Sequence, residues 1–407
     1  MKINHWTKGL LAVGAISVAS LAHAEEKPTL SPVLTALSAT TLSGYIDTTA
    51  IWKPGTGNAN MPGRVYDGPD VQDGFNMNVV SLTLDKPLDE GQWSAGYHAQ
   101  LLLGPGANKR GTGLVQPGGV PNGVAFNEAY VALRVPVGNG LDFHIGQFGT
   151  YNGYEAFDTY KNPNWSRSYG FYIESSAHTG VTASYKVNDL ISVQAGVGNT
   201  ASFSNQVDAK AGTPLVPGGI GVVGAESVKS YLGMITLTAP DSAGFLKGAS
   251  LSAGYTSGVN NGTLGPRVHQ MYVGASIPTP VAGLAVGLAY DYTANIPTAV
   301  IPNKSYANAA ALYLTYQASE KLKFANRFDY GSGSDGAYGY VSTTTPGDEL
   351  FSYTLTADYS LWKNVITRGE FRWDHALSGG TPFGGTVPGI GTEKNSVSLA
   401  MNIIYMF

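Results

Sequence analysis

The chain has 407 residues, of which 24 are Lys or Arg and 28 are Asp or Glu, so its formal net charge is −4 and its charged fraction is only 13%. Soluble proteins usually carry about 25% charged residues, and nucleic-acid-binding proteins carry a basic stripe. Helical membrane proteins have apolar runs of about 20 residues, and no such run occurs after residue 24. The composition, with 53 glycines and 24 tyrosines, disfavours these three classes, and the lack of cysteine excludes disulfides and thiol chemistry.

The first 24 residues have the layout of a secretory signal. Lys2 and Lys8 supply positive charge, residues 9–21 are apolar, and Ala22-His23-Ala24 forms a small-x-small cleavage site. A short membrane anchor is the alternative, but the apolar run is too short to span a bilayer comfortably. We therefore predict a cleaved signal peptide over residues 1–24, a short periplasmic segment over residues 25–40 and a transmembrane β-barrel over residues 41–407.

From residue 41 onwards, apolar and polar residues alternate in stretches of about ten residues, which is typical of strands with one apolar face. Between Trp93 and Leu101, for example, every second residue is apolar and the others are polar or glycine. The segments near Phe75 and Val228 are the least regular. The 16 predicted strands begin near Thr41, Phe75, Trp93, Ala125, Leu141, Ala177, Leu190, Val228, Gly248, Arg267, Leu284, Tyr306, Leu322, Leu350, Val365 and Asn395.

The connections between these segments alternate in length. Short ones include residues 136–140, 188–189 and 319–321, and long ones, rich in Gly, Pro and Asn, cover residues 53–74, 104–124, 149–176, 199–227, 331–349 and 376–394. Outer-membrane barrels have short periplasmic turns and long external loops. We therefore predict an all-β fold, a transmembrane antiparallel β-barrel of about 16 strands, which is wide enough for an aqueous channel.

The polar faces of several predicted strands carry charged side chains, and four of them alternate along one strand between residues 368 and 374. Unpaired charges in a dry core cost several kcal/mol each, whereas beside water they cost little. The solvated face of a soluble sheet is the alternative, but aromatic residues at the strand ends favour a membrane. We predict a wet lumen lined by Arg134, His144, Lys186, Arg327, Arg368, Glu370, Arg372 and Asp374.

Two segments resemble known outer-membrane proteins. The chain ends in an aromatic strand with Phe407 last, and this resembles the assembly signal of outer-membrane barrels. Residues 142–187 contain, in order, Ile145-Gly146-Gln147-Phe148-Gly149, Gly153-Tyr154-Glu155, Ser166-Arg167-Ser168 and His178-Thr179-Gly180-Val181. This stretch resembles the OmpL-like β-barrel outer-membrane porin family, which implies passive diffusion of ions and small hydrophilic solutes through a water-filled channel.

The connection over residues 149–176 is unusually rich in aromatic residues for an external loop. Exposing them would create a large apolar patch, and packing them on the inner wall would remove it. We therefore predict that this loop enters the lumen, where Glu155 and Asp158 face Arg167 or wall cations such as Arg134, and that the constriction is formed by Tyr154, Glu155, Asp158 and Arg167. The alternatives are an external loop whose aromatic residues pack on one another, or one whose last part extends the next strand.

Sites for cofactors and metals have little support. Asp67, Asp70 and Asp73 in the first long loop are spaced unlike an EF-hand, so only their density suggests a calcium site. The histidines lack the spacing of a zinc enzyme, and no cofactor is predicted.

Two other functions are considered beside the porin. An adhesin or receptor would use the long loops, and an outer-membrane hydrolase would need a catalytic constellation that the sequence does not reveal. The expected partners are outer-membrane lipid and lipopolysaccharide, the barrel-assembly machinery, small hydrophilic solutes and two further copies in a homotrimer, but no nucleic acid.

Overall fold

The computed structural model describes residues 39–407 except residues 56–58, 61–70, 72, 90–92, 110–122, 200–228, 259–266, 296–304, 339–347 and 388. The predictions on the signal peptide and on Asp67 and Asp70 lie outside the described residues.

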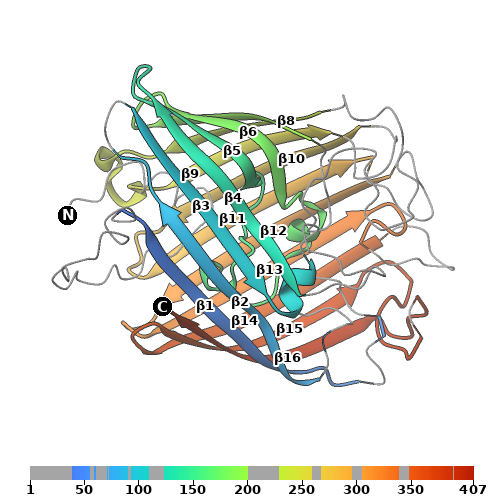
Figure 1. Ribbon diagram of the computed structural model, residues 1–407. Coiled ribbons are helices and arrows are strands. Elements are labelled where there is room, and N and C mark those ends of the chain that lie inside the picture. The colour runs from blue at the N-terminus through green and yellow to red at the C-terminus, as the bar shows by residue number, and fades with distance from the viewer. Residues whose placement is uncertain are drawn as a thin grey trace.

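Sixteen antiparallel strands form a closed barrel (Figure 1). Each strand pairs with its neighbours in the sequence, and β1 closes the barrel by pairing with β16. The strands are β1 (Thr41–Trp52), β2 (Gly74–Lys86), β3 (Ser94–Leu103), β4 (Val124–Val135), β5 (Leu141–Gly149), β6 (Ala177–Lys186), β7 (Ile191–Gly198), β8 (Ser230–Thr238), β9 (Ser250–Gly258), β10 (Val268–Pro278), β11 (Leu284–Ala294), β12 (Tyr306–Gln317), β13 (Leu322–Gly333), β14 (Asp348–Trp362), β15 (Val365–Ala376) and β16 (Asn395–Met406). The predicted fold is confirmed, and every predicted strand begins within two residues of an observed one.

The helical segments are short: η1 (Pro105–Lys109), η2 (Thr159–Lys161), α3 (Tyr169–Ile173) and η4 (Asp241–Leu246). Within the described part of the chain, no helix has the length and apolar character needed to cross a membrane.

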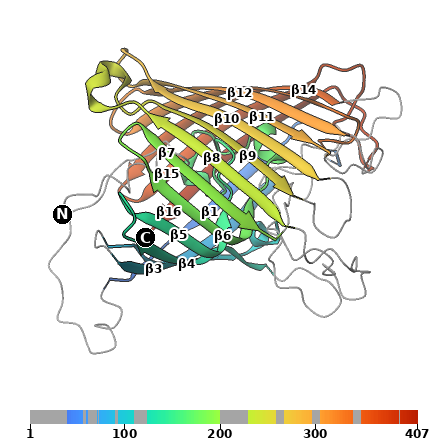
Figure 2. The same ribbon diagram turned by 90° about the horizontal axis from the view of Figure 1, so that it is seen from above.

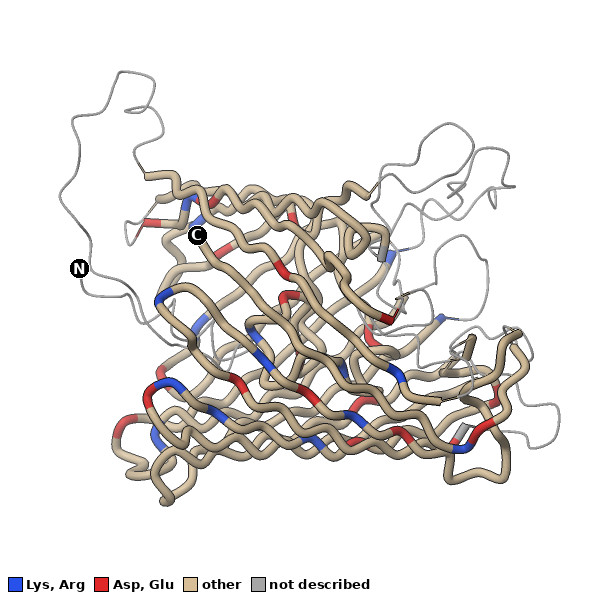
Figure 3. Tube along the Cα trace, turned by 90° about the horizontal axis from the view of Figure 1, so that it is seen from below, with Lys and Arg blue, Asp and Glu red and all other residues tan. Residues whose placement is uncertain are grey.

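The two faces of the wall have opposite chemistry. On β16, Met401 is 72% exposed on the outer face, whereas the adjacent Asn402 is 1% exposed on the inner face. The same alternation places apolar side chains outward on most strands and polar ones inward, as the sequence predicts. Figure 3 shows many Lys, Arg, Asp and Glu positions gathered along one side of the wall.

The two irregular segments have physical explanations. The register between β1 and β2 shifts opposite Asn78, so Asn78 and Val79 are both buried and the alternation breaks. On β8, Leu232 and Met234 are buried on the inner face, and Met234 packs against Tyr151 and Tyr154 of a loop inside the barrel.

That loop covers residues 150–176, connects β5 to β6 and is called the inward loop below. It runs inside the barrel (green in Figures 1 and 2) and contains η2 and α3. Its helix α3 packs on β11, β12 and β13, and Asp158, before η2, bonds to Tyr45 of β1 on another side of the barrel. Most of its side chains are buried, because its aromatic residues pack against the wall.

Candidate functional site

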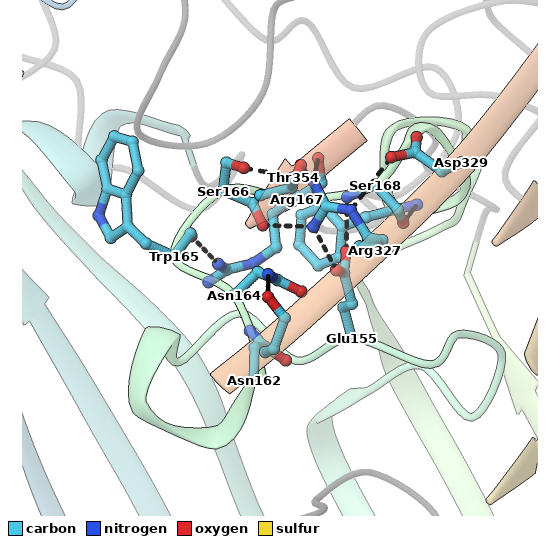
Figure 4. Close-up of polar contacts among 12 residues, drawn as sticks. Glu155, Asn162, Asn164, Trp165, Ser166, Arg167, Ser168, Arg327, Asp329 and Thr354 are labelled. Atoms are coloured by element: carbon cyan, nitrogen blue, oxygen red, sulfur yellow. Dashed lines mark hydrogen bonds and ion pairs between the residues drawn. The ribbon is translucent and has the colours of Figure 1, made fainter. Parts of the chain in front are cut away.

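Arg327 of β13 binds the middle of the inward loop (Figure 4). Its guanidinium lies 2.9 Å from Glu155 Oε1 and 3.1 Å from Asp329 Oδ2, and it donates to the carbonyl oxygen of Ser166 at 2.6 Å. The side chains of Arg327, Glu155 and Asp329 are 0% exposed. Breaking such a buried pair leaves an uncompensated charge, so this contact fixes the loop firmly to the wall.

The four charged residues that alternate along β15, Arg368, Glu370, Arg372 and Asp374, form a polar ladder that binds the same stretch of the loop. Glu370 accepts hydrogen bonds from the backbone nitrogens of Trp165 at 2.6 Å and Ser166 at 2.9 Å. Arg372 donates to the carbonyl oxygen of Arg167 at 2.5 Å and pairs with Asp374 at 2.9 Å. The ladder therefore satisfies backbone groups of the loop that burial would otherwise leave unpaired.

The ends of this ladder extend the attachment. Arg368 pairs with Asp358 of β14 at 2.9 Å and donates to the carbonyl oxygens of Thr159 and Asn162. Asp374 accepts a hydrogen bond from the hydroxyl of Tyr169 at 2.7 Å.

Arg167 contacts backbone oxygens of its own loop. It is 1% exposed and donates to the carbonyl oxygens of Trp165 at 2.5 Å and Phe157 at 2.6 Å, so it holds the loop in its own fold. The predicted alternative partner, Arg134, lies opposite Asp142 in the β4–β5 register and pairs with it at 2.6 Å. Glu155 therefore meets a wall cation, as expected, but that cation is Arg327 of β13, because the directly opposed Asp142 pairs with Arg134.

Asp158 attaches the loop to the other side of the barrel. It accepts hydrogen bonds from Tyr45 of β1 and Gln100 of β3, both at 2.8 Å, and its partner is Lys161 at 2.7 Å, not Arg167 or Arg134. Burial acts to raise the pKa of Asp158, but the positive charge of Lys161 and these hydrogen bonds outweigh it and lower the pKa below its usual value. The carboxylate form is therefore the one that the attachment stabilises.

The remaining predicted lining residues lie elsewhere on the wall. His144 stacks on Tyr130 with 4.2 Å between ring centroids, and Tyr130 stacks on His98 at 5.3 Å. Lys186 pairs with Asp189 at 2.5 Å, at the short turn after β6. Tyr154 stacks on Tyr313 of β12 at 4.3 Å and is only partly buried.

Four further charged side chains are reached by water. The side chain of Lys161 in η2 is 38% exposed, those of Asp85 and His98 are 38% and 21% exposed, and that of Lys323 is 24% exposed. Lys161 interacts electrostatically with Glu128 of β4. A single lysine in a loop carries no sequence signal of this role, because the strands that it faces are distant in the chain.

Phe407 closes the barrel at the β1–β16 seam. Its backbone nitrogen donates to the oxygen of Gly44 at 3.0 Å, and its oxygen accepts from the nitrogen of Gly44 at 2.9 Å. Its ring is 46% exposed. Among the described residues, no group of three or more His, Cys, Asp or Glu side chains could hold a metal ion.

Comparisons with known proteins agree with this geometry. The model of the family described as "Putative beta-barrel porin-2, OmpL-like" matches residues 39–407. No curated protein matches the chain significantly. Three solved structures share the fold over 90% of the chain: the outer-membrane channel DcaP of Acinetobacter baumannii (TM-score 0.58, 13% identity, 97% of that chain), an anion-selective porin of Comamonas acidovorans (0.55, 12%, 99%) and the trimer form of OmpT of Vibrio cholerae (0.55, 10%, 99%).

Proposed function

Because the chain belongs to the OmpL-like β-barrel porin-2 family and is an outer-membrane porin, we propose that ions and small hydrophilic solutes pass through it by diffusion between the inward loop and the β2–β5 side of the wall. The observation that carries this proposal is an asymmetry in burial. Where the loop meets β13 and β15, Arg327 and Arg372 are 0% exposed, whereas Lys161 on the loop and Asp85 on β2 are each 38% exposed.

The narrow part of the path is proposed to lie between Lys161 on the loop and Glu128 of β4 on the wall. Their electrostatic interaction places opposite charges on the loop and on the wall, and charges of this kind set ion preference in pores. Tyr154, which we also predicted at the constriction, packs against Tyr313 of β12 and so lies away from this path. Glu155, Asp158 and Arg167, which we predicted at the constriction, act in this proposal by holding the loop in shape, because all three are less than 10% exposed.

Reversal potentials in a planar bilayer with a salt gradient test this path. Lys161→Gln removes a positive charge and should shift selectivity toward cations, whereas Glu128→Gln should shift it toward anions. Lys247→Gln is the matched control, because Lys247 is 61% exposed beside η4 and far in sequence from the loop. Equal selectivity in all three variants would place the narrowing elsewhere, and a complete lack of conductance would overturn the channel itself.

A channel without catalytic activity fits the lumen better than a hydrolase. The carboxylates of Glu155, Asp329 and Glu370 are occupied by arginine or backbone donors of the loop and wall. Most of the long loops that an adhesin would use lie outside the described residues, so no described feature favours that alternative.

The outer face of the barrel and the two ends of the chain indicate which partners the protein has. We propose that the apolar outer face contacts outer-membrane lipid and lipopolysaccharide, that residues 1–24 are cleaved on export, and that the barrel-assembly machinery recognises the exposed Phe407. A homotrimer is supported by the trimer form of OmpT, which shares the fold. Deleting Phe407 should lower the amount of protein in the outer membrane, and unchanged abundance would contradict the assembly role.

A further inference from the structure

The end of the inward loop places two carboxyl groups against each other. Glu174 follows α3 and is 4% exposed, and Asp291 of β11 is 1% exposed. Thr293, two residues from Asp291 on β11, donates to the oxygen of Ile173, next to Glu174, and this brings together the two carboxyl groups, which interact electrostatically. Backbone encloses the pair, because a Cβ atom at Gly170 would lie 2.6 Å from Asp291 Oδ2 and one at Gly153 would lie 2.2 Å from Glu174 Oε2.

Within the described part of the chain, the groups around the pair include no cation bound to it. From the loop, Glu155 and Tyr154 face it, and β10 contributes Tyr272. On β13, Arg327 is bound to both Glu155 and Asp329, on β12 Tyr313 packs beside Tyr154, and on β6 His178 bonds to Ser175 next to Glu174. Among the described residues, neither Glu174 nor Asp291 takes part in an ion pair.

Two buried carboxylates in contact cannot both be ionised without strong repulsion, and a single shared proton turns that repulsion into a hydrogen bond. Burial, followed by the negative charges of Asp291 and Glu155, raises the pKa of Glu174 well above its usual value. The loop is fastened to the same part of the wall by Ser175, whose backbone nitrogen donates to Gln270 of β10 at 3.2 Å, and by Thr293 of β11, which donates to the oxygen of Ile173 at 3.0 Å.

From this arrangement we propose that Glu174 and Asp291 form a proton-bound latch, which fastens the end of the inward loop to β11 and releases it when the proton is lost. The consequence for permeation rests on the proposed channel function. Loss of the proton places two negative charges in contact, and residues 170–175 then move away from the wall. The middle of the loop stays attached, because guanidinium groups remain charged at every relevant pH.

The direction of the pH effect follows from linkage. The attached state binds the proton more tightly than the released state, in which the carboxyls have ordinary pKa values. Attachment is therefore complete at low pH and weakens as the pH rises through the raised pKa of Glu174. A carboxylate with an ordinary ion pair would behave in the opposite way.

A spin label at the end of the loop tests the latch directly. The chain has no cysteine, so Tyr172→Cys gives a single labelling site on the partly exposed side of α3. Between about pH 5 and about pH 9, the label should become more mobile as the pH rises. Adding Glu174→Gln should abolish this change, because the amide is neutral and donates to Asp291 at every pH. Asp291→Asn should do the same if Glu174→Gln fails to fold.

The matched control is Glu320→Gln, which removes an exposed carboxyl at the β12–β13 turn and should leave the pH profile unchanged. A label whose mobility is constant with pH, or a pH profile that survives Glu174→Gln and Asp291→Asn, would overturn the latch. Conductance of the same variants separates this outcome from failure of the channel, since the label reports loop movement whether or not current flows. In a conducting protein, the conductance should rise with pH in the parent and stay constant in Glu174→Gln.

Discussion

The inward loop is attached to the wall in two regions that differ in chemistry. Its middle lies on β13 and β15, where Arg327, Arg368 and Arg372 bind carboxylates and backbone oxygens. Its end lies on β11, where Glu174 meets Asp291 with no cation between them. An arginine stays charged at every relevant pH, so the first attachment is permanent, whereas the second depends on one proton.

This difference explains how one loop can be both a fixed part of the wall and a movable part of the pore. The permanent region sets which side of the loop faces water, because Glu370 and Arg372 form hydrogen bonds with the backbone groups of Trp165, Ser166 and Arg167. The conditional region lies next to a chain segment that hydrogen bonds at Ile173 and Ser175 also hold to β11 and β10.

The largest effect is expected from removing Arg327, the cation that holds the middle of the loop. Arg327→Gln leaves Glu155 and Asp329 buried without their partner, and breaking a buried ion pair costs about 3–5 kcal/mol. The variant should lose the fixed position of the loop and show larger, noisier single-channel conductance together with a lower unfolding midpoint in urea. Lys321→Gln, at an exposed turn, is the control. Conductance like that of the parent would show that Arg327 does not hold the loop.

A second test concerns the wall on which both attachments depend. Arginine facing lipid near the bilayer midplane costs about 2–4 kcal/mol, whereas a lumen position tolerates it. On β7, Val193→Arg should therefore impair folding into lipid vesicles, and the neighbouring Gln194→Arg should fold nearly as well as the parent. Equal folding yields would mean that the register of β7 is shifted by one residue.

A smaller effect is expected at Asp158, an attachment whose pH dependence is opposite to that of the Glu174–Asp291 pair. Because the pKa of Asp158 is lowered, its contribution is complete above the usual carboxyl pKa and is lost as the pH falls through the lowered value. Asp158→Asn should cost about 1–3 kcal/mol at neutral pH, measured by urea unfolding, and the cost should shrink in acid. A difference between variant and parent that grows in acid would contradict this sign.

The sequence was sufficient for the strands and for the inward direction of the loop, but not for the partners of the loop. Strand positions follow from local alternation, which is interrupted where a bulge lies at Asn78 and where the inner face near Met234 is apolar. The partners are nonlocal: Glu155 meets Arg327 across 172 positions in the chain. Lys161 and Glu174 are ordinary charged residues in a loop, and their surroundings emerge only when the barrel closes around them.

The most direct test of the account compares the two sides of the loop with a charged thiol reagent, in single-cysteine variants of this cysteine-free chain. Lys161 is 38% exposed on the proposed water path, and Ser166 is 3% exposed against Arg327 and Arg372. The reagent should reduce the current through Lys161→Cys rapidly and leave the current through Ser166→Cys unchanged. Rapid block of Ser166→Cys, or no block of Lys161→Cys, would contradict the claim that water passes on the β2–β5 side of a loop held against β13 and β15.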